Sequence, residues 1–157
     1  MTDLRQLFND LVRVETRAYN VIDTRMRSEH DLTLGSFQIM GMIDRYQRAG
    51  QPCRVQALAA EIDITVGATS KAIDRLEARG WCRRRPDPHD GRSSLLSLSA
   101  AGRRAHAAAS PTFEDGVSIC FGAIPARNLA QLADTLSQLR ATFEEAARAH
   151  GQPVPER

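Results

Sequence analysis

The chain has 157 residues, of which 42% are hydrophobic and 25% are charged, and its formal net charge is +2. These values are ordinary for one globular domain, and a charge so close to neutral does not by itself indicate a nucleic-acid partner. No run of about eighteen apolar residues is present and the start, MTDLRQLFND, lacks a signal-peptide core, so we expect a cytoplasmic protein with no membrane partner.

The sequence offers little material for an enzyme or a metal site. It contains no G-x-S-x-G, no H-E-x-x-H and no glycine-rich phosphate loop, so we expect no catalytic residues and no cofactor. The histidines are scattered without a partner at metal-ligand spacing: His30, His89, His106 and His150. Cys53, Cys82 and Cys120 are far apart and form no C-x-x-C, which is typical of free thiols in a reducing compartment.

The first predicted element is a long helix over residues 3–28. Apolar residues follow helical spacing along it, namely Leu4, Leu7, Phe8, Leu11, Val14, Ala18, Val21 and Ile22. A second helix is predicted over Leu34–Arg48, with Thr33 as its N-cap, and Gly50-Gln51-Pro52 ends it. Residues 53–55 are predicted to add a third strand of a single pair to a hairpin that follows later in the chain.

Two further helices form a helix-turn-helix signature. The first covers Val55–Ile62, Thr65 is the cap after the break, and the second covers Val66–Arg79 and stops at Gly80. One face of the second helix is predicted to be core: Thr69, Ala72, Ile73 and Leu76. Near its start, Gly67 and Ala68 are small enough for a close approach to base pairs, and Ser70 and Lys71 carry donors for bases or phosphates.

A hairpin follows, with strands over residues 81–85 and 93–98 and a loop over 86–92 that is rich in Pro, Asp and Gly. Several arginines surround it, and Arg92 at its tip is placed to enter a minor groove. Ser99 then caps a helix over 99–120, in which Pro111 is expected to cause a kink or a new start. A break at 122–125 precedes a last helix over Ala126–Ala149, and residues 150–157 are expected to be disordered.

The last helix repeats apolar residues at alternating spacings of three and four: Leu129, Leu132, Leu136, Leu139 and Phe143. Such a seam is either an intramolecular core or a subunit interface. We favour an interface, formed together with the N-terminal residues Leu4, Leu7, Phe8 and Leu11, because two long seams at opposite ends of the chain can satisfy each other across a two-fold axis.

The run DRLEARGWCRRRPDPHDGRSSLLSLSAAG resembles the wing block of the MarR (multiple-antibiotic-resistance regulator) family. The matching residues occur in register: Leu76, Glu77, Gly80, Trp81, Asp90, Arg92, Leu98, Ser99 and Gly102. The stretch LTLGSFQIM is similar to another family pattern, with Ser36 where Gln is usual. The resemblance implies a mainly α fold with a small β-hairpin wing, in which 31–100 form a winged helix-turn-helix and 1–30 with 101–149 form a dimerisation region.

The resemblance also implies a sequence-specific DNA-binding regulator, most simply a homodimeric repressor of a pseudo-palindromic operator in double-stranded DNA. The predicted DNA-binding residues are Thr65, Gly67, Ala68, Ser70, Lys71, Arg75, Arg83, Asp90 and Arg92. The resemblance further implies that Arg75 and Arg83 contact the DNA backbone and that Asp90 orients the Arg92 guanidinium.

Relatives of this kind bind a small aromatic or acidic effector beside the first, second and fifth helices. The candidates at those positions are Arg17, Tyr19, His30, Phe37 and Met40. Two alternatives stay open at this point. The cysteines could make the chain a redox-sensing regulator, or the winged helix could hold a protein partner without binding DNA.

Overall fold

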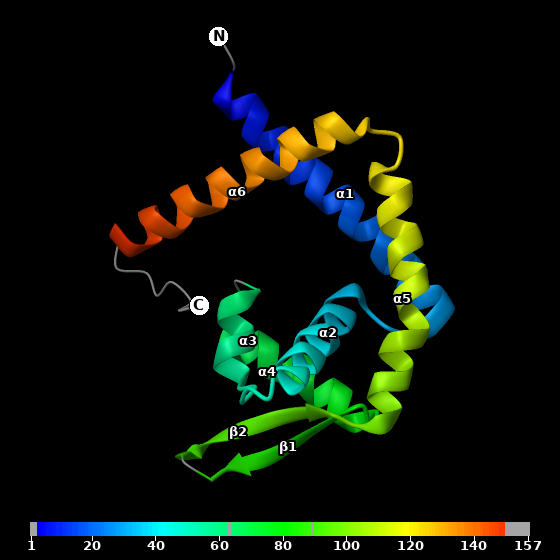
Figure 1. The fold of residues 1–157 in the computed structure, drawn as a ribbon, viewed down its shortest axis with the longest axis vertical. Helices are drawn as coiled ribbons and strands as arrows, with labels where there is room; N and C mark the ends of the chain where they lie inside the picture. The colour runs from blue at the N-terminus through cyan, green and yellow to red at the C-terminus, as the bar shows by residue number, and fades with distance from the viewer. Residues whose placement is uncertain (1–2, 63, 89, 150–157) are drawn as a thin grey trace.

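The computed structural model describes residues 3–62, 64–88 and 90–149. Its elements are α1 (Leu4–His30), α2 (Leu34–Arg48), α3 (Val55–Glu61), α4 (Val66–Ala78), β1 (Cys82–Asp87), β2 (Asp90–Leu98), α5 (Ala100–Phe121) and α6 (Ala126–Ala149). The predicted fold class is confirmed: the chain is mostly helical, with one two-stranded antiparallel hairpin. Figure 1 shows α2, α3, α4 and the hairpin gathered at one end of the molecule.

Local capping chemistry explains where the helices begin. Thr33 and Thr65 adopt extended backbone angles, and their hydroxyls accept hydrogen bonds from Ser36 N and Ala68 N, respectively. Ser99 does the same for Gly102 N at the start of α5. Each cap satisfies an N–H group that has no partner within the helix. These three predicted starts are therefore confirmed, and α2 has the predicted bounds.

The core lies around α2, which is buried along most of its length. Met40 and Ile43 have no exposed surface, and Phe37 and Ile39 are also buried. On the far side, α1 packs along α5, and Ile22 of α1 lies against Gly116 of α5, where an added Cβ would approach it to 3.1 Å. The helix-turn-helix is therefore attached to the long helices through α2 and the C-terminal half of α1.

Two local predictions need correction, and a third is confirmed. The strands of the hairpin are longer than expected, because pairing continues to Asp87 and Asp90, so Arg92 belongs to β2 and not to the loop. The predicted third strand of one pair is confirmed as a single bridge between Arg54 and Leu95. Finally, α5 continues through Pro111 without a new start. The proline ring is exposed, so the carbonyl that loses its helical partner is close to water.

The first turn of α5 rests directly on the turn between α4 and β1. Trp81 O accepts a hydrogen bond from Ser99 N at 3.0 Å, and Ser99 Oγ donates to Gly80 O at 2.6 Å. Gly102 is buried against this turn, and a Cβ there would lie 2.1 Å from Trp81 O. The lack of a side chain at Gly102 is thus what allows α5 to approach the start of the hairpin so closely.

The two ends of the chain leave apolar surface uncovered. Leu4, Leu7 and Phe8 of α1 are 54–74% exposed, and Leu132, Leu136 and Phe143 of α6 are 41–61% exposed. Figure 1 shows α6 leaving the end of α5 and passing across α1 in this view, on the side of the molecule opposite the hairpin. None of the helices in the described ranges is long and apolar enough to cross a membrane.

Candidate nucleic-acid interface

Helix α4 is divided into a buried face and a free face. Thr69, Ile73 and Leu76 are buried, as the sequence predicted, whereas Gly67, Ala68 and Lys71 are exposed. A Cβ at Gly67 would have no neighbour within 4 Å. Val66, which the sequence analysis did not single out, is 47% exposed beside them. The positive end of this helix therefore presents small side chains and one lysine to solvent.

Arg84 of β1 clamps α4 against the hairpin. Its Nη2 lies 2.7 Å from Asp74 Oδ1 and donates to Ser70 O at 3.2 Å, and its backbone N donates to Glu77 Oε1 at 3.0 Å. Arg84 Nε lies 3.3 Å from Glu77 Oε2. Ser70 Oγ also accepts from Arg84, at 3.3 Å, so this predicted DNA-binding side chain is turned toward the hairpin.

The contacts of Arg84 were not predicted from the sequence, although a signal for them is present. Arg84 lies two residues after the buried Cys82, so a strand places both side chains on one face. Asp74 and Glu77 lie three residues apart, so a helix also places them on one face. The predicted strand and helix are consecutive, and a basic residue opposite two acids is the expected pairing.

The hairpin is attached to the rest of the winged helix by a buried carboxylate. Asp87 is 1% exposed and Arg54 binds it from the start of α3, with Arg54 Nε 2.9 Å and Nη2 2.5 Å from Asp87 Oδ2. Ser93 Oγ donates to the same oxygen at 3.3 Å. This ion pair therefore connects both strands of the hairpin to the helix-turn-helix.

The remaining predicted wing residues lie on the surface of the hairpin or outside the described part. Arg83 and Arg85 are exposed and alternate with the inward-facing Cys82 and Arg84 along β1. Asp90 is exposed at the first position of β2, and the backbone of Arg92 lies in the same strand. The Arg92 side chain and His89 fall outside the described residues.

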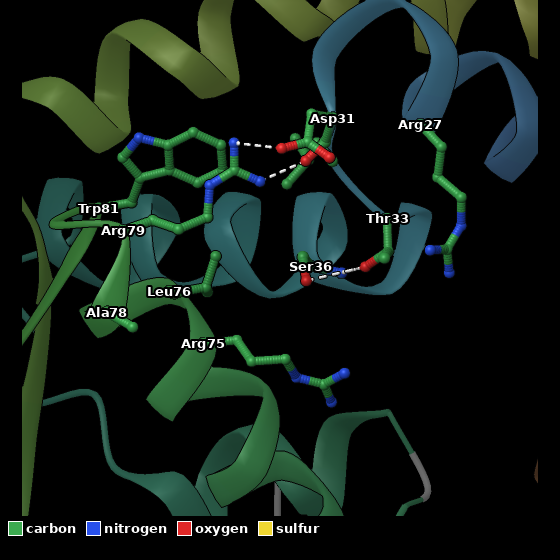
Figure 2. A pocket seen from close by; sticks show the side chains of 10 residues that line it. Arg27, Asp31, Thr33, Ser36, Arg75, Leu76, Ala78, Arg79 and Trp81 are labelled. Atoms are coloured by element: carbon green, nitrogen blue, oxygen red, sulfur yellow. Dashed lines mark hydrogen bonds and ion pairs between the residues drawn. The ribbon is translucent and has the colours of Figure 1, made fainter.

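A cavity of about 440 Å³ opens between the α1–α2 junction and the C-terminal half of α4 (Figure 2). Its lining combines three arginines and one aspartate with two hydroxyls and several apolar side chains: Arg27, Asp31, Leu32, Thr33, Ser36, Arg75, Leu76, Ala78, Arg79 and Trp81. The Arg79 guanidinium lies 3.8 Å from the centre of the Trp81 ring. Arg79 also donates to Asp31 O and lies 3.2 Å from Asp31 Oδ2.

None of the five residues predicted to bind an effector lines this cavity. Phe37 and Met40 are buried in the core, where Phe37 stacks on His106 with ring centres 4.4 Å apart. His30 Nε2 is 2.8 Å from Thr112 Oγ1 on α5. Arg17 and Tyr19 are exposed on α1. A cavity made by the ends of three helices depends on tertiary packing, for which the sequence carries no local signal.

The cysteines are placed as packing residues. Cys53 and Cys82 are 2% and 3% exposed, and Cys120 is half-buried. Burial raises the pKa of the Cys53 thiol to about 12 and that of the Cys82 thiol to about 11. Because the thiolate is the reactive form, both thiols are inert at neutral pH, which does not favour the redox-sensing alternative.

Thiol titration tests this assignment. At pH 8 in buffer, we expect a disulfide reagent to modify only Cys120 quickly, and to reach Cys53 and Cys82 only after denaturant is added. Because both raised pKa values lie above the ordinary thiol pKa, these thiols keep their protons to a higher pH in the folded state than in the unfolded state. The free energy of unfolding should therefore fall as pH rises above about 9, by about 1.4 kcal/mol per pH unit for each thiol. Rapid modification of all three cysteines in the folded chain would contradict the assignment.

Comparison with known proteins identifies the family. The MarR family model matches residues 32–94, which run from the α1–α2 junction into β2. Residues 32–94 therefore carry a MarR-family domain. Curated relatives agree: over 108 residues the chain is 26% identical to the multiple antibiotic resistance protein MarR of Escherichia coli and 29% identical to that of Salmonella typhimurium. Each match covers 65% of this chain and 72% of the relative.

Solved structures of MarR-family regulators share the fold. A mutant of MarR from E. coli complexed with operator DNA matches with a TM-score of 0.76 at 21% identity, covering 85% of this chain and 93% of that one. CouR from Rhodococcus jostii RHA1, bound to p-coumaroyl-CoA, matches with a TM-score of 0.71 at 22% identity, covering 82% of this chain and 87% of that one. These likenesses confirm the winged-helix architecture.

The MarR-family pattern residues have structural roles in this chain. Leu76 is buried, and Glu77 binds the backbone and the side chain of Arg84. Gly80 has φ +69°, a left-handed conformation that favours glycine. Gly102 permits the contact with Trp81 described above. The pattern therefore fixes how α4, the hairpin and α5 meet, while the exposed start of α4 lies outside it.

Proposed function

We propose that this MarR-family chain is a homodimeric, sequence-specific DNA-binding repressor that a small-molecule ligand releases from its operator. The observation that carries the proposal is the exposed start of α4, where Gly67, Ala68 and Lys71 are free on the surface. The cationic strand face that contains Arg83 and Arg85 follows on the adjoining hairpin. A helix enters a major groove with its N-terminal residues, and cations on a wing contact the flanking backbone or minor groove.

The uncovered apolar residues support a dimer. The N-terminal half of α1 and the length of α6 carry Leu4, Leu7, Phe8, Leu132, Leu136 and Phe143 with exposures of 41–74%. A stable monomer rarely exposes so many large apolar side chains along two helices, and a second copy of the chain can bury them. The two recognition helices would then face successive major grooves about 34 Å apart, which requires a pseudo-palindromic operator.

Two measurements test the proposal with the full chain. Sedimentation velocity at micromolar concentration gives the oligomeric state, and we expect a dimer. Fluorescence anisotropy with duplexes from the DNA upstream of the coding region gives affinity, and we expect log K to fall with log salt by about 0.9 for each phosphate contact. A chain that is monomeric and does not bind duplex DNA at low salt would refute the proposal. Binding to a protein partner instead would show no such salt dependence.

Lys71 provides a specific prediction. It is the single lysine of the chain and it is exposed on the free face of α4. Replacing Lys71 with alanine should weaken operator binding by about 1–3 kcal/mol, because one charged contact to DNA is lost. Arg104→Ala, an exposed arginine on α5, is the control and should leave affinity unchanged. Equal losses for the two variants would mean that α4 does not face the DNA.

Release by a ligand is the finer part of the proposal. It is supported by the likeness to CouR, whose structure holds p-coumaroyl-CoA. It is also supported by the cationic cavity beside α4, because three arginines against one aspartate favour an anionic occupant. The buried, raised-pKa thiols of Cys53 and Cys82 leave the redox alternative without support.

A further inference from the structure

We infer that the start of α4 recognises the C5-methyl group of a pyrimidine through Val66, with Ile64 beside it, so that operator affinity depends on that methyl group. The inference rests on the proposed DNA binding and deepens it, because it names the chemical group that the helix distinguishes. Thymine carries this group, and so does 5-methylcytosine. Neither Val66 nor Ile64 is among the residues that the sequence predicted to bind DNA.

Two β-branched apolar side chains are exposed where the helix-turn-helix leads into α4. Ile64 is 43% exposed and Val66 is 47% exposed. They flank Thr65, whose hydroxyl caps the helix by accepting a hydrogen bond from Ala68 N at 3.2 Å. Ile64 N donates to Ala59 O at 3.1 Å, which attaches this backbone to α3. Both apolar side chains therefore project from backbone that hydrogen bonds hold in place.

The polar side chains over residues 64–71 are mostly engaged within the protein. Thr69 is buried, and its hydroxyl donates to the carbonyl of the cap residue at 3.1 Å. Ser70 Oγ accepts from Arg84 at 3.3 Å, so it is turned toward the hairpin. Lys71 is exposed and is the one charged residue of this stretch. The surface that the stretch presents to a base pair is therefore mainly apolar.

This surface matches one feature of the major groove. Asn and Gln are the usual partners of adenine and Asp and Glu those of cytosine, and residues 64–71 contain none of these four types. The methyl group of thymine is instead contacted by apolar side chains. A Cβ at Gly67 would have no neighbour within 4 Å, so the helix is not held away from the bases next to Val66.

The surrounding charge supports DNA as the occupant of this apolar surface. Lys71 follows Val66 on α4, and Arg83 and Arg85 are exposed on the adjoining strand β1. Cations placed around a helix that enters the groove contact phosphates and fix its position, but they carry no sequence information. Val66 then adds discrimination at a position that the cations fix.

The lack of a polar group on Val66 has a consequence for cytosine. Thymine and cytosine differ at C4, where thymine has an oxygen acceptor and cytosine an amino donor. A valine side chain makes no hydrogen bond to either group, so it responds to the methyl group alone. At the contacted position, 5-methylcytosine paired with guanine should therefore bind as well as thymine paired with adenine, whereas cytosine and uracil should bind more weakly.

The test measures fluorescence anisotropy of the full chain with a duplex from the DNA upstream of the coding region. Deoxyuridine replaces thymine one position at a time, which removes the methyl group and leaves base pairing unchanged. At the contacted position we expect about fourfold weaker binding for each methyl group removed, the factor for one buried carbon. At the same position, 5-methylcytosine should bind about fourfold more tightly than cytosine.

Variants of the protein show whether the methyl group acts through Val66. Val66→Ala should bind the thymine and deoxyuridine duplexes equally, and because Val66 is exposed this change should not disturb folding, which circular dichroism checks. Ile124→Ala removes a 38% exposed side chain from the turn between α5 and α6 and should keep full discrimination. The discrimination should also be equal at low and high salt, because an apolar contact releases no counterions.

The outcomes separate this inference from the proposed function. If the chain binds duplex DNA but deoxyuridine has no effect at any thymine, the inference is overturned and the DNA binding stands. The same holds if Val66→Ala discriminates as well as wild type, because the methyl group then acts through the shape of the duplex. Equal binding of cytosine and 5-methylcytosine also overturns it. A chain that binds no duplex refutes the proposed function and the inference together.

Discussion

Replacement of Arg54 by alanine is expected to lower the free energy of unfolding by about 2 kcal/mol, because a buried carboxylate loses hydrogen bonds from a side chain that is itself 37% exposed. Asp87 is 1% exposed, and it loses two hydrogen bonds from Arg54 in this variant. The hydroxyl of Ser93 still reaches the carboxylate, which limits the loss. Urea unfolding at pH 7 measures the effect, with far-ultraviolet circular dichroism as the signal.

A second ion pair offers a matched control. Arg45 pairs with Glu61 between α2 and α3, and both side chains are about a third or more exposed. Arg45→Ala should therefore cost less than about 1 kcal/mol. The double variant Arg54→Ala/Asp87→Asn should recover part of the loss, because the buried side chain that loses the Arg54 hydrogen bonds is then neutral. Equal destabilisation by Arg54→Ala and Arg45→Ala would show that Asp87 has access to water.

Gly102→Ala is expected to cost about 3 kcal/mol, which is the upper end for overpacking a close contact, and to lower the melting temperature by about 10 °C. The new Cβ would lie 2.1 Å from Trp81 O and 2.9 Å from Trp81 C, and both are backbone atoms that cannot rotate away. The first turn of α5 must therefore lift off the start of β1, and the hydrogen bond from Ser99 N to Trp81 O should be lost with it.

Gly67→Ala is the control, because Gly67 is also a helical glycine but a Cβ there would have open space. This variant should gain about 0.5–1 kcal/mol, since alanine loses less backbone entropy in a helix. Differential scanning calorimetry of both variants provides the comparison. If Gly102→Ala were as stable as Gly67→Ala, the tight junction between α5 and the hairpin would be disproved.

The helices could be predicted from the sequence because their signals are local. Thr33, Thr65 and Ser99 each precede an apolar pattern, and each caps the predicted helix. The fold class followed from the same patterns together with the wing block. The predicted length of the hairpin was wrong. Residues rich in Pro, Asp and Gly predict a loop, although strand pairing continues through them to Asp87 and Asp90.

The interactions that assemble the site were harder to predict. The ion pair between Arg54 and Asp87 joins residues 33 positions apart, and neither residue stands out in its own segment. The cavity depends on where the ends of α1, α2 and α4 meet, so Ser36 and Arg79 gave no local signal. The exposed face of α4 could be predicted, because amphipathic periodicity separates it from the buried face that contains Ile73.

If the proposed DNA binding holds, the contacts of Arg84 have a consequence for the choice of operator. Because Asp74, Glu77 and Ser70 are all attached to β1, helix α4 and the hairpin cannot shift independently of each other. A single base pair inserted between the positions that these two parts touch could not be absorbed by the protein. The duplex would have to twist or bend to restore the alignment, so its stiffness would contribute to selectivity at positions that no side chain reaches.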